Sequence, residues 1–423
     1  MIWIYRILVA GLLPLVIPVL KIRDRLRGKR RPSFSGRFAR DLPDLPTGCI
    51  WLHAVSVGEV EIARRLVREF DALGSEFPVL ITATTATGLD VARRTMGNTV
   101  TVIPCPLDLP GALGRVFDAA RPRALVVVET ELWPEMLHQA GRRGVPTAVI
   151  NARLSDSSFR SYRRVRPLLR PLLEPVSMVL ARSPADAERF SELGVPRAKI
   201  RTAGNIKYDL EPDSSPLAWI EAVRSAAGER PIIVAGSTME GEETVVLDTV
   251  SRLDAAGQPV LLVLAPRHPE RFEAVADLVT RRGLGLTRRS GSEPPTDATA
   301  VFLLDTIGEL ARAYRASAVA FIGGSLAPTG GHNPLEPAVW GVPVLSGPHI
   351  HNFVEVYDEM TAAGAARLVS DGDELAAALV HWLDNPVEAA GAGEAGRRVV
   401  ETNRGATALT AEAVLDLAGG SPS

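Results

Sequence analysis

Three carboxylates follow short apolar runs in the first half of the chain. Glu59 comes after CIWLHAV and is preceded by Ser56 and Gly58, whereas Glu129 and Glu131 come after ALVVV. A carboxylate at a strand end can take a proton from an acceptor hydroxyl, glycine permits close backbone approach, and paired acids can bind hydroxyls or support a base. The structural alternative is that these acids complement a helix dipole and accept from free N–H groups at a helix start.

The densest candidate site is a glycine-rich segment in the second half of the chain. After the apolar run AVAFI it contains Gly330, Gly331, His332 and Asn333, and a proline then marks a helix start with Glu336 in the first turn. Glycines before a helix N-terminus form a site for an anion such as phosphate, and the glutamate can accept hydrogen bonds from ribose hydroxyls. A purely structural turn does not need this density of polar residues and glycine, so the segment predicts a phosphate-binding loop.

Two other turns carry weaker signals of the same kind. Ser237 lies in AGSTMEGEE, a Gly-Ser turn suited to receiving a phosphate on backbone amides. Arg267 and His268 end an apolar run in LAPRHPERF, where a cation can hold phosphate or carboxylate by charge-assisted hydrogen bonds. Solvated surface charge is the alternative for this pair.

Several other activities lack their signatures in the sequence. The first strand-turn-helix and the glycine-rich loop do not form G-x-G-x-x-G, which argues against a nicotinamide dehydrogenase, and no G-x-x-x-x-G-K-[ST] loop is present. The seven histidines show no H-E-x-x-H spacing. Asp371 and Asp373 open a predicted helix and are interpreted as a cap. The sequence therefore predicts no metal site and no cofactor.

The elements that must position these residues alternate along the chain. Apolar runs such as PVLITAT, PTAVINA and SMVLARS look like buried parallel strands, each followed by a helix-length segment. This alternation predicts doubly wound α/β sheets, whose ligands lie beyond the carboxyl ends of the strands. A polar, proline-rich stretch, Asp209 to Pro216, interrupts the pattern. We therefore expect two Rossmann-like domains facing across a cleft, over residues 41–210 and 217–423, with the terminal helices in the second.

Length and composition fit this organisation. The 423 residues are enough for two domains, and 46% hydrophobic with 23% charged residues is typical of a packed globular protein. The net charge of −2 argues against a general nucleic-acid partner. Only two cysteines, Cys49 and Cys105, are present, which favours a reducing compartment over a disulfide framework.

The N-terminal 40 residues differ from the rest in charge and apolarity. Met1 to Leu20 is apolar apart from Arg6 and the Tyr5 hydroxyl, and Lys21 to Arg31 is strongly basic. Residues 1–40 hold ten basic residues and one acid, for a net +9. We interpret them as a membrane anchor that either spans the bilayer or lies along it, with the basic run on anionic headgroups. The alternative is a buried core helix with a basic tail.

Taken together, the motifs resemble one family, the 3-deoxy-D-manno-octulosonic acid (Kdo) transferases of lipid A assembly. The motifs HAVSVGE, ETELWP, NARLSD, GNIKYD, APRHPERF and GGHNPLEP occur in the family's order, from near the N-terminal segment to the second domain. Each is weak alone, but six in order are specific.

The resemblance implies a glycosyltransferase fold of the B type, with the N-terminal half binding acceptor and the C-terminal half binding CMP-Kdo. It also implies membrane association at the cytoplasmic face of the inner membrane of a Gram-negative bacterium. Family members move Kdo to the 6′ hydroxyl of the lipid A precursor (lipid IVA), with inversion at the anomeric carbon and without metal or cofactor at the transfer step.

The resemblance also assigns roles to residues. Glu59 matches the proposed general base. The nucleotide-binding segment corresponds to Gly330, Gly331, His332, Asn333 and Glu336, and flanking donor-side segments to Ser237, Arg267 and His268. Supporting or acceptor-side contacts are expected from Ser56, Gly58, Glu129, Glu131, Asn205 and Lys207. The chain departs from the family at Met239, where histidine is expected.

Two alternatives to Kdo transfer stay open at the level of sequence. A sugar-nucleotide epimerase, or a transferase using another donor, shares the glycine-rich loop with its glutamate. A basic membrane anchor argues against a soluble epimerase. A non-catalytic, membrane-tethered binding protein for sugar nucleotides would keep the loop but would not need Glu59.

Overall fold

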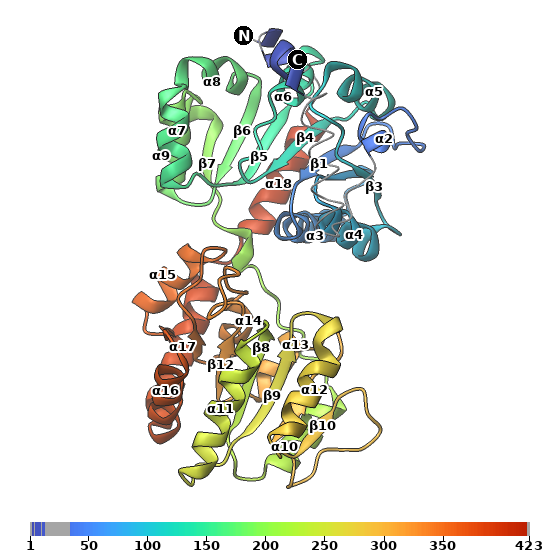
Figure 1. Ribbon diagram of the computed structural model, residues 1–423. Coiled ribbons are helices and arrows are strands. Elements are labelled where there is room, and N and C mark those ends of the chain that lie inside the picture. The colour runs from blue at the N-terminus through green and yellow to red at the C-terminus, as the bar shows by residue number, and fades with distance from the viewer. Residues whose placement is uncertain (1, 4, 10, 13–33, 421–423) are drawn as a thin grey trace. The chain divides into compact units, whose positions relative to one another are not determined.

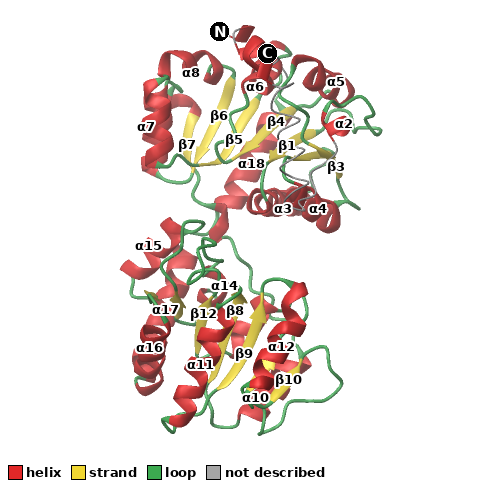
Figure 2. Cartoon of the chain, viewed as in Figure 1, coloured by secondary structure: helices red, strands yellow, loops and turns green. Residues whose placement is uncertain are grey.

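The computed structural model describes residues 2–3, 5–9, 11–12 and 34–420 of the chain. These residues form two compact units (Figure 1). Unit 1 comprises residues 1–209 and 404–423, and unit 2 comprises residues 210–403. Both units are α/β structures built on a seven-stranded parallel sheet, as Figure 2 shows by the alternation of helix and strand. The predicted fold class of two Rossmann-like α/β domains is thereby confirmed.

Unit 1 contains the first seven strands in the order β3-β2-β1-β4-β5-β6-β7. The strands are β1 (Ile50–Ala54), β2 (Val79–Ala83), β3 (Thr101–Pro104), β4 (Ala124–Val128), β5 (Thr147–Ala152), β6 (Val176–Ala181) and β7 (Ile200–Thr202). The helices are α2 (Phe34–Arg37), α3 (Val57–Ala72), α4 (Ala86–Met96), α5 (Pro110–Ala120), α6 (Pro134–Arg142), α7 (Asp156–Arg164), α8 (Arg166–Leu173), α9 (Pro184–Leu193) and α18 (Ala406–Gly419), with short 3₁₀ turns η1 (Arg197–Lys199) and η2 (Ile206–Tyr208).

Unit 2 contains the remaining strands in the order β10-β11-β9-β8-β12-β13-β14. The strands are β8 (Ile232–Thr238), β9 (Leu261–Pro266), β10 (Leu286–Arg288), β11 (Val301–Leu303), β12 (Val319–Ile322), β13 (Val344–Ser346) and β14 (Ala366–Leu368). The helices are α10 (Ala218–Ala227), α11 (Glu242–Ala255), α12 (Phe272–Arg281), α13 (Leu310–Ala313), α14 (Leu335–Ala338), α15 (Val354–Ala362), α16 (Gly372–Asp384) and α17 (Pro386–Thr402), with 3₁₀ turns η3 (Pro269–Arg271) and η4 (Tyr314–Ala316).

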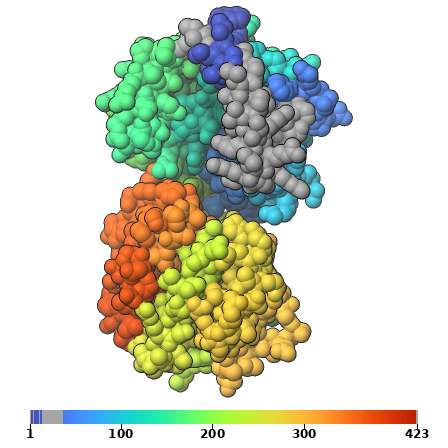
Figure 3. Space-filling model, in the orientation of Figure 1, coloured from blue at the N-terminus to red at the C-terminus, as the bar shows by residue number. Residues whose placement is uncertain are grey.

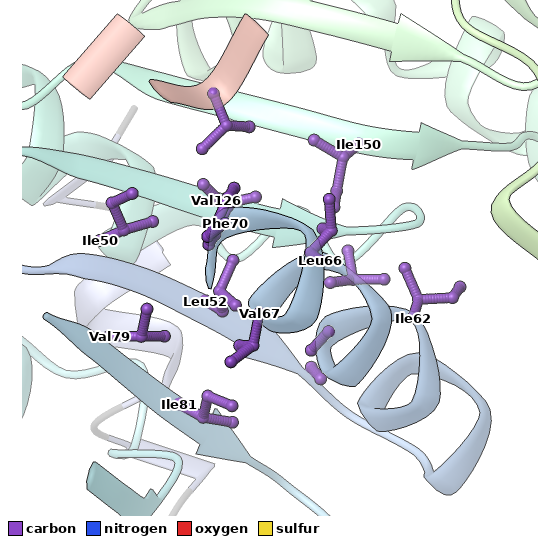
Figure 4. Close-up of a cluster of buried hydrophobic side chains, with 14 of the residues drawn as sticks. Ile50, Leu52, Ile62, Leu66, Val67, Phe70, Val79, Ile81, Val126 and Ile150 are labelled. Carbon is purple, nitrogen blue, oxygen red and sulfur yellow. The ribbon is translucent and has the colours of Figure 1, made fainter. Parts of the chain in front are cut away.

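The strands read as continuous apolar runs because both faces of each sheet are covered by helices. The core between α3 and the unit 1 sheet illustrates this packing (Figure 4). Ile62, Leu66 and Phe70, one helical turn apart, lie in one cluster with Leu52 of β1 and Ile81 of β2, and each is almost completely buried. This spacing is the apolar stripe of a helix that packs on a sheet.

Each sheet has a point where the strand order reverses. In unit 1 the chain runs from β1 outward to β3 and then returns to β4 on the other side of β1. In unit 2 it leaves β8 toward β9 and returns to β12 on the other side of β8. The crevice beyond the carboxyl ends of the two strands at such a reversal is where doubly wound sheets bind ligands. The segments after β1 and β4, and after β8 and β12, are therefore the places to look for function.

The last helix belongs to unit 1, which corrects the sequence-based assignment of residues 217–423 to one domain. α18 packs on α3 and β4, and Ala411, Val414 and Ala418 are buried in the same core cluster as β1. The physical reason is the composition of α18, whose alanine and valine side chains cover an apolar face of unit 1 left bare by the earlier helices. The sequence pattern identified the helix but not the sheet that it covers.

The predicted membrane anchor lies mostly outside the described residues, which omit 1, 4, 10 and 13–33. The described residues between 2 and 12 are helical. The Tyr5 hydroxyl donates to Asp108 at 2.6 Å, and the Arg6 guanidinium forms a two-point ion pair with Glu135 at 2.8 Å. In the described part of the chain, no helix has the length and apolarity needed to cross a bilayer.

Candidate active site

Glu59 lies at the reversal point of the unit 1 sheet, in the first turn of α3. Its carboxylate accepts from the Val55 N–H at 2.7 Å, from the Ser56 hydroxyl at 2.8 Å and from the Ser56 N–H at 3.3 Å. The Ser56 hydroxyl in turn accepts from the Glu59 N–H, which completes a capping box. Glu59 therefore has the structural role considered from the sequence, that of accepting from backbone N–H groups at a helix start. This role fixes the position of its carboxylate at the end of β1.

The same carboxylate has an unusual proton affinity. Only 6% of Glu59 is exposed, and this burial raises the pKa of its carboxyl group to about 7. Hydrogen bonds from Ser56 and Val55 oppose the shift, while the negative charges of Glu129 and Glu131 add to it. A carboxyl group that is half ionised near neutral pH is suited to accept a proton from a hydroxyl and to release it again. The capping geometry and an acid–base role are compatible.

Glu129 and Glu131 occupy the other side of the reversal point, directly after β4. Glu129 has a φ of 60°, which is uncommon for a residue with a side chain, and its N–H donates to the Ile150 carbonyl at 2.8 Å. Burial raises the pKa of Glu131, although the Trp133 indole N–H donates to its carboxylate at 3.2 Å. The structure thus brings the three predicted carboxylates together at the carboxyl ends of β1 and β4.

Of the two predicted residues in the GNIKYD motif, Lys207 lies beside these acids and Asn205 stabilises the turn that carries it. The Lys207 Nζ lies 4.0 Å from the Glu129 carboxylate. Asn205 is buried, and its side-chain oxygen accepts from the Lys207 N–H at 3.1 Å, so it shapes the η2 turn. Asn151, at the end of β5 with a φ of 47°, accepts from the Ile206 N–H at 3.0 Å. Asn151 therefore connects η2 to the sheet.

His53 is a buried residue near this site that the sequence reasoning did not single out, although HAVSVGE begins with it. Its Nδ1 lies 3.0 Å from the Thr82 hydroxyl, its ring meets the Trp133 ring edge-on at 5.8 Å, and its Nε2 has no hydrogen-bond partner within the described residues. Complete burial lowers the pKa of His53 to about 3. The imidazole is therefore neutral near pH 7. A polar side chain within the apolar run CIWLHAV was the available sequence signal.

In unit 2 the predicted donor residues gather at the reversal point between β8 and β12. Ser237 is half-buried with a φ of 56°, a strained backbone for a serine. A side chain at Gly323 would come within 2.6 Å of the Ser237 carbonyl, so only glycine lets the two strand ends pack this closely. The Gly331 N–H donates to the Gly324 carbonyl at 2.7 Å. The glycine-rich loop is thereby folded back onto the end of β12.

Glu242 organises both strand ends, and sequence reasoning missed it. Only 2% of this residue is exposed, and its carboxylate accepts from five backbone N–H groups. One donor, Met239, follows β8, and the other four follow β12. The distances are 2.8 Å to Met239, 2.7 Å to Gly324, 2.8 Å to Ser325, 2.8 Å to Leu326 and 3.1 Å to Ala327. The repeated acids of MEGEE were the available signal, but four of the five donors to Glu242 lie more than 80 residues away.

His332 connects the glycine-rich loop to the turn after β9. Burial lowers the pKa of His332 to about 4, and the positive charges of Arg267 and His268 add to that shift. Arg267 is exposed and forms no ion pair within residues 34–420, while the His268 ring lies 3.8 Å from the Glu270 carboxylate. The His332 Nε2 has no hydrogen-bond partner in the described part of the chain. His332 is therefore neutral near pH 7 and lies within electrostatic range of Arg267 and His268.

The remaining two predicted residues of the loop lie around α14, which is only four residues long. The Asn333 side-chain oxygen accepts from the Leu335 N–H at 3.1 Å and caps this turn. Glu336 is half-buried, and its charge adds to burial in raising the pKa of Tyr314. The expected helix after the loop is thus a single turn, and it does not supply the dipole of a full helix.

A surface cavity of about 630 Å³ lies elsewhere, between α5 and α6. It is lined by Arg115, Arg142 and Arg143 among others, and by none of the predicted site residues. This cavity is not the candidate site, because Arg115 is bonded to the Phe38 and Ala39 carbonyls, Arg143 is bonded to Asp118, and none of the three predicted carboxylates lines it.

The structure contains no group of three or more histidines, cysteines and acids suited to a metal within the described ranges. Asp371 accepts from the Asp373 and Glu374 N–H groups, each at 3.0 Å, as the N-cap of α16. The absence of a metal or cofactor in the reaction stays a prediction. Cys49 and Cys105 are both free and buried.

Comparison with known proteins adds to this geometry. A family model described as 3-deoxy-D-manno-octulosonic-acid transferase (kdotransferase) matches residues 29–210. The 3-deoxy-D-manno-octulosonic acid transferase of Haemophilus influenzae is 37% identical over 393 residues, 92% of this chain and 91% of the relative. The enzyme of the same name from Bordetella pertussis is 34% identical over 429 residues, 98% of this chain and 99% of the relative.

Solved structures with low sequence identity share the fold. A glycosyltransferase from Rickettsia africae is 13% identical with a TM-score of 0.58, covering 89% of this chain and 100% of its own. A UDP-GlcNAc 2-epimerase from Neisseria meningitidis is 15% identical with a TM-score of 0.53, covering 84% of this chain and 98% of its own. At these identities the similarity concerns the fold alone.

Proposed function

The chain belongs to the Kdo transferase family of glycosyltransferases, and we propose from that premise that it transfers Kdo from CMP-Kdo to the lipid A precursor with Glu59 as the general base. The observation that carries the proposal is the position of Glu59. Its carboxylate is fixed at the carboxyl end of β1, at the reversal point of the sheet, with a pKa of about 7.

The proposed reaction is an inverting displacement. The Glu59 carboxylate takes the proton of the acceptor hydroxyl while the hydroxyl oxygen bonds to the anomeric carbon of Kdo. The bond from that carbon to the phosphate oxygen of CMP breaks, and CMP leaves with the electron pair. A sugar hydroxyl is a poor nucleophile, so a positioned base is worth about 10²–10⁴-fold in rate. Glu129, Glu131 and Lys207 are proposed to orient acceptor hydroxyls beside this base.

Unit 2 is proposed to bind the donor. The glycine-rich segment from Gly330 to Asn333, together with Ser237, is proposed to lie against the donor phosphate. The N–H groups of residues 324–327, which begin this loop, are bonded to Glu242 and serve to shape it. Arg267, His268 and His332 are proposed to stabilise the negative charge of CMP as it leaves, or the carboxylate of Kdo. Glu336 is proposed to accept from the ribose hydroxyls. Met239 supplies a backbone N–H to Glu242, and this contact does not depend on its side chain.

The acceptor is proposed to be a membrane lipid met at the cytoplasmic face of the inner membrane of a Gram-negative bacterium. Residues 1–40, with their net charge of +9, are proposed to contact the anionic lipid surface. Trp3 and Ile7 support this, because they are 69% and 70% exposed on the described part of the N-terminal helix. A nucleic-acid partner is not part of the proposal.

The epimerase alternative is supported by the similarity in fold alone. The epimerase of known structure shares the fold of this chain at 15% identity, about the same low level as the 13% of the glycosyltransferase. The relatives at 34–37% identity over nearly the whole chain are Kdo transferases by name. These relatives favour transfer over epimerisation.

The test is mass spectrometry of a tetraacylated lipid A precursor after incubation with detergent-purified protein and freshly generated CMP-Kdo. A gain of one or more Kdo masses supports the proposal and counts the residues transferred. No gain, while a Kdo transferase of known activity works in parallel, contradicts it and points to another sugar nucleotide. A parallel incubation with UDP-GlcNAc, assayed for the epimerised sugar, tests the alternative.

A further inference from the structure

One segment on the surface of unit 1 is strongly basic. Between Ser157 and Leu173 the chain has no acid and five arginines, and it forms α7 and α8. The five side chains are exposed, and in the described part of the chain none of them pairs with a carboxylate. They are Arg160, Arg163, Arg164, Arg166 and Arg170. We call this segment the arginine hairpin.

The acids closest in sequence and fold do not neutralise the hairpin. Asp156, which begins α7, pairs with Arg189, and Glu188 on α9 pairs with Arg197. Glu174, the exposed residue that follows α8, forms no ion pair with the five arginines within residues 34–420, so it offsets one of the five charges at a distance. The Arg163 guanidinium lies 5.8 Å from the centre of the Phe159 ring, a contact that leaves its positive charge available. The hairpin therefore presents a net positive surface without an internal counter-charge.

Large apolar side chains are exposed among these arginines. Val165 is 41% exposed and Leu168 is 57% exposed, whereas Leu169 packs against the core and Leu173 is 1% exposed. α8 thus buries one face and turns another toward solvent with a leucine on it. The green surface around this segment is visible on the outside of unit 1 in Figure 3.

The arginine hairpin and the N-terminal helix both contact α6. α8 packs on α6, and the N-terminal helix is tied to the start of α6 by the ion pair of Arg6 with Glu135. Both elements that contact α6 carry exposed apolar side chains, since Trp3, Ile7 and Leu8 of the N-terminal helix are each more than half exposed.

We propose that the arginine hairpin is a second membrane contact, which docks on an anionic lipid bilayer independently of residues 13–33. Its arginines bind lipid phosphates, and Val165 and Leu168 enter the boundary between headgroups and acyl chains. This inference rests on the proposed function, because an enzyme with a membrane-borne acceptor must meet the bilayer. The two exposed apolar side chains favour lipid over RNA, which would be bound by the arginines alone.

The test uses a fluorophore sensitive to polarity, placed at Leu168→Cys in the full-length protein. Labelling is selective because Cys49 and Cys105 are buried. The matched control is Arg94→Cys on α4, an exposed position of the same unit. On vesicles of phosphatidylethanolamine with phosphatidylglycerol, we expect several-fold brighter, blue-shifted emission at position 168 and no change at position 94. Phosphatidylcholine vesicles give neither effect.

A charge reversal separates the hairpin from the N-terminal segment. Combining Arg163→Glu, Arg166→Glu and Arg170→Glu is expected to abolish the emission change at position 168, whereas Arg93→Glu with Arg94→Glu retains it. A silent label at position 168 on protein that floats with vesicles would overturn the proposal, as would a response to RNA without one to vesicles.

Failure of this proposal is distinguishable from failure of the proposed function. The fluorescence readout needs no turnover, and the charge-reversed protein is expected to transfer Kdo to detergent-dispersed acceptor at the rate of the unmodified protein. A normal rate in detergent with a silent label would overturn the membrane contact alone. A bilayer response without transfer would support the contact and contradict the reaction.

Discussion

The carboxylate of Glu242 accepts a hydrogen bond from the backbone N–H of Gly324, 82 residues later, at 2.7 Å. The same oxygen accepts from the Met239 N–H at 2.8 Å, so one side chain joins the turn after β8 to the loop after β12. These two segments carry the residues proposed to hold the donor. Glu242 is thus expected to act on donor binding by positioning backbone, without touching the donor.

Replacing Glu242 by glutamine should disturb this arrangement. The amide NH₂ would face backbone N–H groups that now find a carboxylate oxygen, at a cost of about 2–4 kcal/mol in the free energy of unfolding. We expect a lower Tm and at least tenfold weaker CMP binding by calorimetry. Glu240→Gln, at an exposed side chain, is the control and should change neither. Unchanged CMP binding in a destabilised Glu242→Gln protein would contradict the positioning role.

Replacing Glu59 by glutamine should stop turnover and spare the fold. Glutamine also serves in a capping box, so α3 keeps its start, but it cannot accept the acceptor proton. We expect kcat to fall by about 10²–10⁴-fold with CMP binding unchanged. Asp71→Asn, exposed at the other end of α3, is the matched control. Turnover that persists in Glu59→Gln would contradict the assignment of Glu59 as the general base.

The pH dependence of transfer should report the Glu59 carboxyl group. The base is active when ionised, and its pKa is about 7, so the rate should rise with pH through the neutral range. The negative charge of Glu131 contributes to raising that pKa, so Glu131→Gln should lower it and move the rising limb to lower pH. A pH–rate profile of both proteins checks this. A limb that stays in place would show that another group titrates.

Replacing Gly58 tests whether the acceptor approaches the backbone at the start of α3, since the substitution is not expected to destabilise the fold. It is exposed in the first turn of α3, and an added Cβ would meet only the Ser56 hydroxyl, at 3.9 Å. Gly58→Ala should therefore leave the free energy of unfolding unchanged or increase it by up to about 1 kcal/mol, the difference in helix propensity between glycine and alanine. The Tm should accordingly stay the same or rise. If the acceptor approaches this backbone, as we predict, transfer slows in the same variant. Full activity would remove Gly58 from the acceptor site.

The attachment of α18 to unit 1 should depend on Asp209. Its carboxylate accepts from the Gly405 N–H at 2.6 Å, the Thr407 N–H at 2.5 Å and the Thr407 hydroxyl at 2.6 Å. The helix has no cap from its own N-cap residue, Gly405, so Asp209 caps it from a distance in sequence. Asp209→Ala should cost about 1–2 kcal/mol and speed hydrogen exchange in α18. Asp213→Ala, at an exposed carboxylate of unit 2, should not.

The strands and the places where chemistry gathers could be predicted from the sequence. A strand buried on both faces is a continuous apolar run, and in a doubly wound sheet the residues after such a run lie at one edge. This local pattern was enough to expect Glu59 after one strand, Glu129 and Glu131 after a second, and the glycine-rich loop after a third. The roles of these residues in transfer remain predictions.

What only the tertiary structure decided depends on contacts between distant residues. Asp209 meets Thr407 across 198 residues, and Glu242 meets Gly324 across 82, and neither partner is marked by periodicity or spacing. The pKa of Glu59 is likewise a property of its environment, because burial and the two acids that follow β4 raise it. Hydropathy patterns record which face of an element is buried, which is local. The identity of the partner that buries it, and the charge that results, exist only once the chain has folded.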